Sequence, residues 1–299
     1  MEKEKAKYID RIEVKGLWGR FNVNWDLHPD VNILVGENGT GKSTILQIMF
    51  KAVEECSDGL KSQNIIDYRD AHHQSKILFK PAFIAPFNAK NNGIERDSTD
   101  ILIPKIDYIQ TFDAFLKITD LDRYYNKGLY TPLDYDLNEV INAFVSYQLD
   151  QTKKIINQKI DTTTAFAKMR YFMDTVNRLF INTGKVVDEN DNRIVFLIGN
   201  EVQIEPNQLS SGEKQLLLIL LTVLCQDEKP TILLMDEPEI SLHLRWQYEL
   251  IEVIRELNPN CQVIIVTHSP SLFTNGWRNR VFWMEDLSEL ITPKMLETI

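Results

Sequence analysis

Cysteine is scarce in this sequence. The 299 residues include three cysteines, Cys56, Cys225 and Cys261, and these share no paired spacing. An odd number of cysteines without such spacing fits neither a disulfide scaffold nor a zinc cluster. Buried free thiols in a reducing compartment are the simplest interpretation, so the chemistry of this chain has to come from other side chains.

Long apolar runs and an excess of positive charge are also missing. The longest apolar run, LLLILLTVLC at 216–225, is far shorter than the roughly 20 residues of a membrane-spanning helix. The first ten residues, MEKEKAKYID, are charged throughout and show no signal peptide. Lys and Arg number 33 against 43 Asp and Glu, a net charge of −10, which argues against a surface devoted to DNA or anionic lipid. We expect a cytoplasmic protein with no membrane association.

Strand-like and helix-like patterns alternate along the chain, which indicates an α/β fold. Apolar residues make up 43% of the sequence, enough for a sizeable core, and its length fits one large domain with an insertion. Residues 8–35 show the pattern of antiparallel strands and end in the buried-strand run VNILV. Further strands are predicted at 105–110, 230–238 and 261–270, a hairpin at 193–206, and helices at 43–56, 212–225 and 241–257. Strands alternating with helices imply a mostly parallel sheet.

Residues 137–185 have helical periodicity and lie within the predicted insertion. Two antiparallel helices joined near Asp161–Thr164 are the simplest interpretation. The expected apolar faces are Val140, Ile141, Phe144, Val145, Leu149, Thr152 and Ile156 in the first helix, and Phe166, Met169, Met173, Val176 and Phe180 in the second. We expect a core at 1–110 and 186–299 and an inserted helical lobe at 111–185. Residues 57–105 show no clear pattern.

The lobe differs in charge from the rest of the chain. Residues 137–185 carry seven bases against four acids, a local charge of +3. The bases are Lys153, Lys154, Lys159, Lys168, Arg170, Arg178 and Lys185. Opposite charge on a projecting lobe indicates a contact surface for nucleic acid or for an acidic partner, and an ordinary solvated helix face is the alternative.

The strongest motif is GENGTGKST at 36–44, which matches G-x-x-x-x-G-K-[ST] and has an apolar strand before it and an amphipathic helix after it. The glycines let backbone N–H groups point inward around phosphate oxygens, and the helix N-terminus adds partial positive charge. We expect Lys42 to reach the β- and γ-phosphates of a nucleotide and Ser43 to ligate Mg²⁺. The other residues expected to bind the nucleotide here are Asn38, Gly39, Thr40, Gly41 and Thr44.

Two acids end a buried strand in ILLMDEPE at 232–239. Ligands bind at the carboxyl ends of strands in open α/β sheets, so these acids are placed for chemistry. Asp236 suits the Mg²⁺ shell, and Glu237 suits a general base that polarises the attacking water. The alternative is that the two acids belong to a solvated turn, and the presence of the phosphate loop argues against it.

Two further motifs carry a resemblance to a known family. LSSGEKQ at 209–215 resembles the signature motif of ABC-type ATPases, and His268 in THS resembles their switch histidine. The four motifs also stand in the order of that superfamily. EPEISLH at 237–243 departs from the transporter pattern. Together with the phosphate loop and LSSGEKQ, it resembles the SMC/RecF/OLD-like branch with AAA15/AAA21-type ATPase domains.

The resemblance implies an ABC-type ATPase head, a P-loop NTPase with a mixed sheet, an antiparallel N-terminal part and an inserted helical hairpin. It implies ATP and Mg²⁺ as cofactors and heads that dimerise head-to-tail around ATP, as a homodimer or a higher homo-oligomer. In that arrangement Ser210 and Gly212 contact the γ-phosphate in trans, and Ser241 lies in the loop that crosses the seam. Ser211 and Glu213 stand where ABC-type ATPases usually have glycine and glutamine, and this branch tolerates both replacements.

Family members also carry a glutamine after a strand, where it contacts Mg²⁺ and the attacking water. Gln110, which ends KIDYIQ, is our candidate for both contacts, with an ordinary strand-end glutamine as the alternative. Gln47 and Gln74 are weaker candidates. In GLWGRF at 16–21, Trp18 or Arg20 could reach the nucleotide, although a plain hairpin turn is the simpler interpretation.

Our first hypothesis for the function is an ATPase that acts as sensor or motor in a defence or DNA-maintenance complex, with anti-phage defence as one setting that the resemblance implies. No nuclease motif is visible in the sequence, so an effector, a nuclease or a toxin, would act in trans. The ATPase subunit of a membrane transporter is the alternative, and a nucleotide-gated assembly protein with slow or no turnover is a third hypothesis.

Overall fold

The computed structural model describes residues 7–58, 74–80, 83–88, 93–94, 104–110, 131–199 and 201–291. The chain divides into two compact units, each built from separate stretches of sequence. Unit 1 comprises Met1–Ile109, Pro230–Glu237 and Asn260–Ile299, and unit 2 comprises Gln110–Lys229 and Pro238–Pro259. Among the described residues, no helix combines the length and the apolar character needed to cross a membrane.

A five-stranded parallel sheet forms the base of unit 1. In spatial order its strands are β13 (Val281–Trp283), β3 (Val31–Val35), β12 (Cys261–Val266), β11 (Thr231–Asp236) and β7 (Lys105–Ile109). Every residue of β3, β11 and β12 is buried. Parallel strands covered on both faces need continuous apolar runs, which explains why these segments lack alternation. The predicted parallel sheet is confirmed, and its strands all end at one edge.

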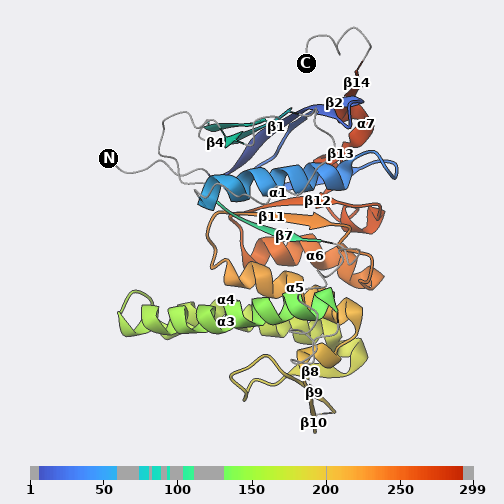
Figure 1. Cartoon of the computed structure of the whole chain (residues 1–299). Coiled ribbons are helices and arrows are strands. Elements are labelled where there is room, and N and C mark those ends of the chain that lie inside the picture. Colours follow the sequence, from blue (N-terminus) through green and yellow to red (C-terminus); the bar gives the residue numbers. More distant parts are fainter. Residues whose placement is uncertain are drawn as a thin grey trace. The chain divides into compact units, whose positions relative to one another are not determined.

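A second sheet of unit 1 is antiparallel. Its order is β14 (Ser288–Leu290), β2 (Phe21–Asp26), β1 (Tyr8–Leu17), β4 (Gln74–Lys80), β5 (Phe83–Asn88) and β6 (Gly93–Ile94). Helix α1 (Lys42–Asp58) lies between the two sheets (Figure 1). Trp25, Met49 and Val266, from the antiparallel sheet, α1 and the parallel sheet, belong to one buried cluster. The predicted N-terminal antiparallel part is confirmed, and β4 to β6 extend it into a stretch where the sequence shows no clear pattern.

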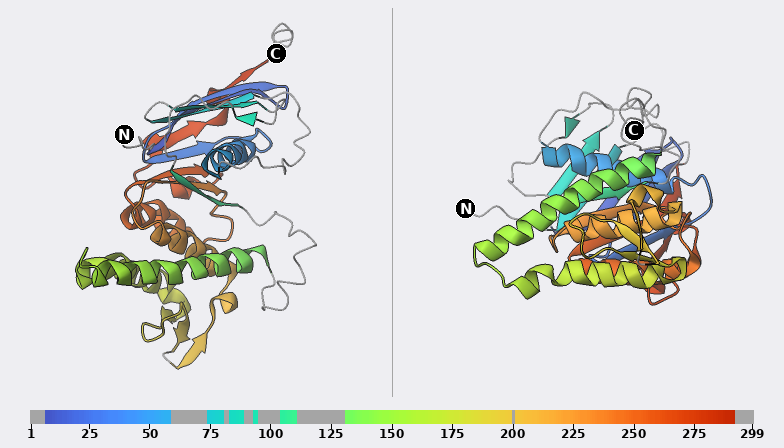
Figure 2. Two further views of the ribbon diagram at one scale, coloured as in Figure 1. Left: turned by 60° about the vertical axis from the view of Figure 1, so that its left-hand side comes forward. Right: turned by 90° about the horizontal axis from the view of Figure 1, so that it is seen from below.

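Unit 2 is mainly helical. It contains α3 (Pro132–Ile156), α4 (Thr162–Leu179), α5 (Ser211–Cys225) and α6 (Leu244–Leu257). Helices α3 and α4 join at one end and contact each other, as the predicted hairpin requires, and they diverge from that junction (Figure 2). Asp161 caps α4, because its side chain accepts a hydrogen bond from the backbone N–H of Thr164. Helix α3 begins at Pro132, five residues before the predicted helical pattern, which starts at Leu137.

The predicted apolar face of α3 is wrong in its rotation. The apolar side chains that α3 buries are Leu133, Leu137, Phe144 and Tyr147. Of the predicted face only Phe144 is buried, and Val145, Leu149 and Ile156 are 44%, 57% and 73% exposed. Both sets obey steps of three and four. Periodicity alone therefore could not choose between them, and packing of α3 against α4 and α5 decides.

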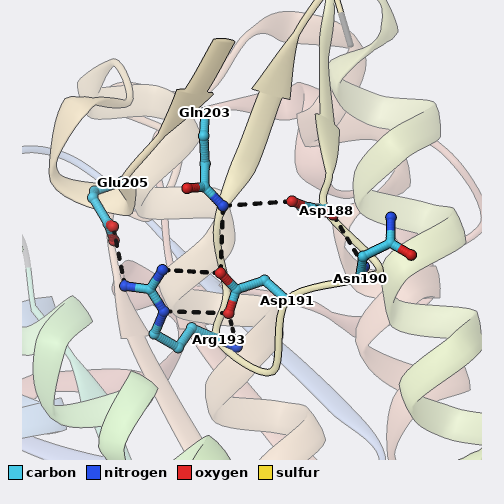
Figure 3. A network of polar contacts seen from close by, with 6 residues as sticks. All are labelled: Asp188, Asn190, Asp191, Arg193, Gln203 and Glu205. Atoms are coloured by element: carbon cyan, nitrogen blue, oxygen red, sulfur yellow. Dashed lines mark hydrogen bonds and ion pairs between the residues drawn. The ribbon is translucent and has the colours of Figure 1, made fainter. Parts of the chain in front are cut away.

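Three short strands complete unit 2, with β8 (Lys185–Val187) beside β9 (Phe196–Ile198) and β9 beside β10 (Val202–Ile204). The pairing of β9 with β10 confirms the predicted hairpin. Figure 3 shows the polar network that joins the β8–β9 loop to β10, with Arg193 bonded to Asp191 and Glu205. These bonds from Arg193 lower the pKa of Asp191 to about 2. The network lies just before the 209–215 motif in the chain.

Candidate functional site

The phosphate loop connects β3 to α1 at the carboxyl edge of the parallel sheet. The loop is tight, because a Cβ on Gly41 would lie 2.8 Å from Cδ2 of Leu17. Gly39 and Gly41 have φ angles of +74° and +99°, in the region that favours glycine. Lys42 Nζ donates to the carbonyl oxygens of Gly36 and Glu37, at 3.0 and 2.7 Å. A buried ammonium that lies across the loop in this way fits the binding of phosphate oxygens.

Burial lowers the pKa of Lys42, and the nearby carboxylates of Glu237, Glu285 and Asp236 offset only part of that effect. Helix α1 starts at Lys42, so the first backbone N–H groups of the helix face the loop without helical acceptors. The glycine backbone, the ammonium and the helix N-terminus together fit a polyphosphate. Asn38, Gly39, Thr40 and Thr44 belong to the same loop and first turn.

Ser43 and Asp236 meet although 193 residues separate them. Ser43 Oγ donates to Asp236 Oδ1 at 3.0 Å. The contact follows from topology, because Asp236 ends β11 and Ser43 lies in the first turn of the helix that follows β3. A hydroxyl and a carboxylate are the hard oxygen donors that Mg²⁺ prefers. The donor set therefore fits the predicted metal.

Glu237 and His268 meet at the ends of neighbouring strands. His268 Nε2 lies 3.2 Å from Glu237 Oε1, and the His268 backbone N–H donates to Glu237 Oε2 at 3.1 Å. Glu237 has a φ of +46°, which an L-residue adopts only at a cost of about 1–3 kcal/mol. Its backbone N–H donates to Val266 O at 2.8 Å. The strained turn thus directs the carboxylate toward the neighbouring strand end, where His268 holds both oxygens.

Glu285 is a residue that the sequence does not single out. It lies in the short helix α7 (Met284–Leu287), and its Oε1 accepts a hydrogen bond from the Glu37 backbone N–H at 3.1 Å. That bond, the backbone N–H of Glu285 itself and the charge of Lys42 lower the pKa of Glu285. Only the pairing of β13 with β3 brings α7 to the phosphate loop, so no local signal could have found it.

The 209–215 motif opens helix α5 in unit 2. Ser210 is the N-cap, and Glu213 completes a capping box with it. A Cβ on Gly212 would lie 2.3 Å from the carbonyl oxygen of Ser241. Glycine is therefore needed where the EPEISLH loop packs on α5. Helix α6 begins at Leu244, three residues later than predicted, because His243 caps it.

The remaining candidates lie in several places. Gln110 is exposed and directly follows β7, whose last residue, Ile109, is in register with Met235. The ring of Trp18 approaches the phosphate loop, because a Cβ on Gly41 would lie 3.3 Å from its Cη2. Arg20 lies over the ring of Phe21, at 5.1 Å from the centroid. Gln47 lies on α1, and the side chain of Gln74 lies outside the described residues.

Comparison with known proteins identifies relatives of this chain. The Retron Vc95 probable ATPase of Vibrio cholerae serotype O1 biovar El Tor is 23% identical over 88% of this chain and 71% of its own length. Septu protein PtuA of Bacillus thuringiensis is 22% identical over 88% of this chain and 72% of its own length.

A solved SMC head, bound to the C-winged helix domain of ScpA, matches 98% of this chain and all of its own chain at 14% identity, with a TM-score of 0.51. This likeness shows the fold and confirms the predicted fold class. The sequence model of the family AAA_21, described as "AAA domain, putative AbiEii toxin, Type IV TA system", matches residues 75–274. The chain belongs to this family of P-loop ATPases, whose resemblance the sequence motifs predict.

Proposed function

We propose that this chain binds ATP with Mg²⁺ and hydrolyses it to ADP and phosphate. One observation carries the proposal: Asp236 and Glu237 are consecutive residues at the end of β11, and their carboxylates contact Ser43 Oγ at 3.0 Å and His268 Nε2 at 3.2 Å. The proposed metal ligand and the proposed base thus stand side by side at one strand end. A solvated turn would have no need for either contact.

In this proposal each side chain has one role. Lys42 binds the β- and γ-phosphates, while Ser43 and Asp236 hold Mg²⁺, which supplies positive charge to the phosphate oxygens when bound. Glu237 accepts a proton from the attacking water. The oxygen of that water bonds to the γ-phosphorus, and the bond between the γ-phosphorus and the β–γ bridging oxygen breaks. His268 keeps the carboxylate in place. Gln110 contacts Mg²⁺ and the water.

We propose further that two heads dimerise head-to-tail around ATP. Ser210 and Gly212 at the N-terminus of α5 would contact the γ-phosphate held by the other head, where the partial positive charge of a helix end favours an anion. The tight contact between Gly212 and Ser241 supports this role, because it fixes the seam loop against the signature. The nucleotide-binding core would comprise 1–110 and 186–299, and the inserted lobe 111–185.

The setting that we propose is a defence complex in which the ATPase acts as sensor or motor and a separate effector, a nuclease or a toxin, acts in trans. The relatives that are a retron ATPase and a Septu protein support this setting. The SMC head with the same fold binds a separate protein, ScpA, which supports a protein partner.

Binding of nucleic acid to residues 137–185 stays a prediction. In the structure this stretch has less unpaired positive charge than the sequence indicates. Five of the seven bases of this stretch form ion pairs. The pairs are Lys153–Asp150, Lys154–Asp227, Lys168–Glu228, Arg178–Glu249 and Lys185–Glu213. A protein effector is therefore the partner that we favour.

Two substitutions test the proposal, Lys42→Ala and Glu237→Gln. Lys42→Ala should abolish ATP binding, measured by equilibrium titration with a fluorescent ATP analogue. Glu237→Gln should bind ATP normally but lose at least about 100-fold in turnover, and light scattering should show a dimer that persists with ATP and Mg²⁺. Lys159→Ala, on an exposed lysine of unit 2, is the control and should behave as the parent.

Hydrolysis by Glu237→Gln at the parental rate would overturn the assignment of the base. A monomeric mass for Glu237→Gln at saturating ATP would overturn the head-to-tail dimer while leaving ATP binding intact. The two parts of the proposal can thus fail separately.

A further inference from the structure

The signature helix carries a buried acid. Glu213, in the first turn of α5, is almost completely buried. Its Oε2 accepts hydrogen bonds from the backbone N–H and from the Oγ of Ser210, both at 2.8 Å. The acid therefore holds the hydroxyl that the proposed dimer would offer to a phosphate.

A single lysine bridges both oxygens of this carboxylate. Lys185, the first residue of β8, places its Nζ 2.7 Å from Oε1 and 2.8 Å from Oε2 of Glu213. The two side chains are 17% and 1% exposed. Lys185 comes two residues after the 3₁₀ helix Phe180–Thr183 that extends α4, with Gly184 between them. The lysine that pairs with the signature carboxylate therefore comes from just beyond the helical hairpin.

The charge of Glu213 affects how well the N-terminus of α5 can bind an anion. A carboxylate at the N-terminus of a helix stabilises the helix, but it repels a polyphosphate that approaches the same end. A carboxylate here needs a cation beside it if the helix end is to accept an anion, and Lys185 is within hydrogen-bond distance of both oxygens.

We propose that Lys185 is a positioning residue for the ATP-bound dimer. It neutralises Glu213, so that Ser210 and the N-terminus of α5 can contact the terminal phosphate of a nucleotide held by a second copy of the chain. This inference rests on the proposed head-to-tail dimer. It predicts that Lys185 acts on dimerisation and leaves the binding of ATP to the separate chain unchanged.

The opposite end of the same helix offers a matched control pair. Lys154 Nζ lies 2.7 Å from Oδ2 of Asp227, which follows the C-terminus of α5, and these side chains are 33% and 20% exposed. Lys154→Met thus removes a lysine from a paired carboxylate and leaves the charge at the signature unchanged.

The experiment uses the full chain with Glu237→Gln, and it measures the dimer fraction against protein concentration at saturating ATP and Mg²⁺ by sedimentation. Lys185→Met should weaken the dimer about tenfold, because a carboxylate then faces the phosphate unpaired. The second change Glu213→Gln should restore the dimer to within about threefold. Lys154→Met should leave it unchanged. ATP affinity at concentrations that keep the chain monomeric should be equal in all variants.

A second variant keeps the test decisive if Lys185→Met does not fold. Lys185→Gln retains a hydrogen-bond donor without the charge, and it should weaken the dimer as well. Equal loss of dimer in the Lys185 and Lys154 variants, or a parental dimer in Lys185→Gln, would overturn the inference alone. Absence of any ATP-dependent dimer in the Glu237→Gln chain would overturn the proposed dimer, and this inference with it.

Discussion

At the scale of single residues, neighbours in the sequence have unlike tasks. Asp236 is the last residue of β11 and touches Ser43, whereas Glu237 turns into the left-handed region and touches His268. One peptide unit thus separates the proposed metal ligand from the proposed base. The sequence predicts a role for each of the two acids. The positive φ of Glu237, which directs its side chain away from that of Asp236, is visible only in the structure.

His268→Ala tests the contact with the base. It removes the imidazole that lies 3.2 Å from Glu237 Oε1 and leaves the backbone N–H bond to Oε2. We expect kcat for ATP hydrolysis to fall about 100-fold with KM unchanged, since the side chain acts on the base and not on binding. His28→Ala is the control, because His28 precedes β3 at the opposite edge of the sheet. A fall in ATP affinity without a fall in kcat would contradict this role.

Asp191 gives a prediction on pH. Its folded pKa of about 2 lies below the ordinary value of 3.8, so its contribution to stability is present above 3.8 and is lost as the pH falls toward 2. Asp191→Asn should lower the melting temperature by about 1 °C at neutral pH. The difference in melting temperature between the parent and Asp191→Asn should shrink as the pH falls below 3.8. A difference that grows on acidification, in thermal denaturation followed by circular dichroism, would contradict the assignment.

At the scale of elements, α3 shows what periodicity can and cannot predict. Its existence, type and approximate length follow from the pattern of apolar residues, and so does its pairing with α4. Its rotation does not, because two overlapping stripes satisfy the same spacing. The stripe with Leu137, Phe144 and Tyr147 is buried, and it brings Gln151 and Lys154 to Asp227.

A pair of truncations tests this rotation. Phe144→Ala should lower the free energy of unfolding by about 3–5 kcal/mol, because it removes a buried ring. Leu149→Ala, on the exposed face, should change it by no more than about 0.5 kcal/mol. Chemical denaturation monitored by fluorescence measures both. Equal losses of unfolding free energy in the two variants would mean that Leu149 is buried like Phe144, as periodicity alone predicts.

At the scale of the whole molecule, each unit is assembled from stretches that lie far apart in the sequence. Unit 1 takes its parallel sheet from three separate stretches, and the site at its edge joins residues from all of them. Ser43 comes from the first stretch, Asp236 and Glu237 from the second, and His268 from the third. Ligand binding at this edge should therefore stabilise the fold as a unit.

Ligand removal tests that coupling. At ATP concentrations of about 100 times Kd, binding to the folded chain alone adds about 2.7 kcal/mol to the free energy of unfolding. We expect the melting temperature to rise with ATP and Mg²⁺ and to fall back when EDTA removes the metal. Lys42→Ala should show no rise. An equal rise in Lys42→Ala would place the nucleotide elsewhere.

The sequence by itself determined the motifs, their order along the chain, the family that they resemble and the α/β class, because each depends on local patterns. Only the tertiary structure decided which face of α3 is buried, that Glu285 bonds to the phosphate loop, and that Lys185 neutralises Glu213. Contacts of this kind depend on the register and rotation of elements that are distant in the sequence and pack together in space. The periodicity of apolar residues determines whether a segment is a helix or a strand, and tertiary packing determines which of its faces is buried.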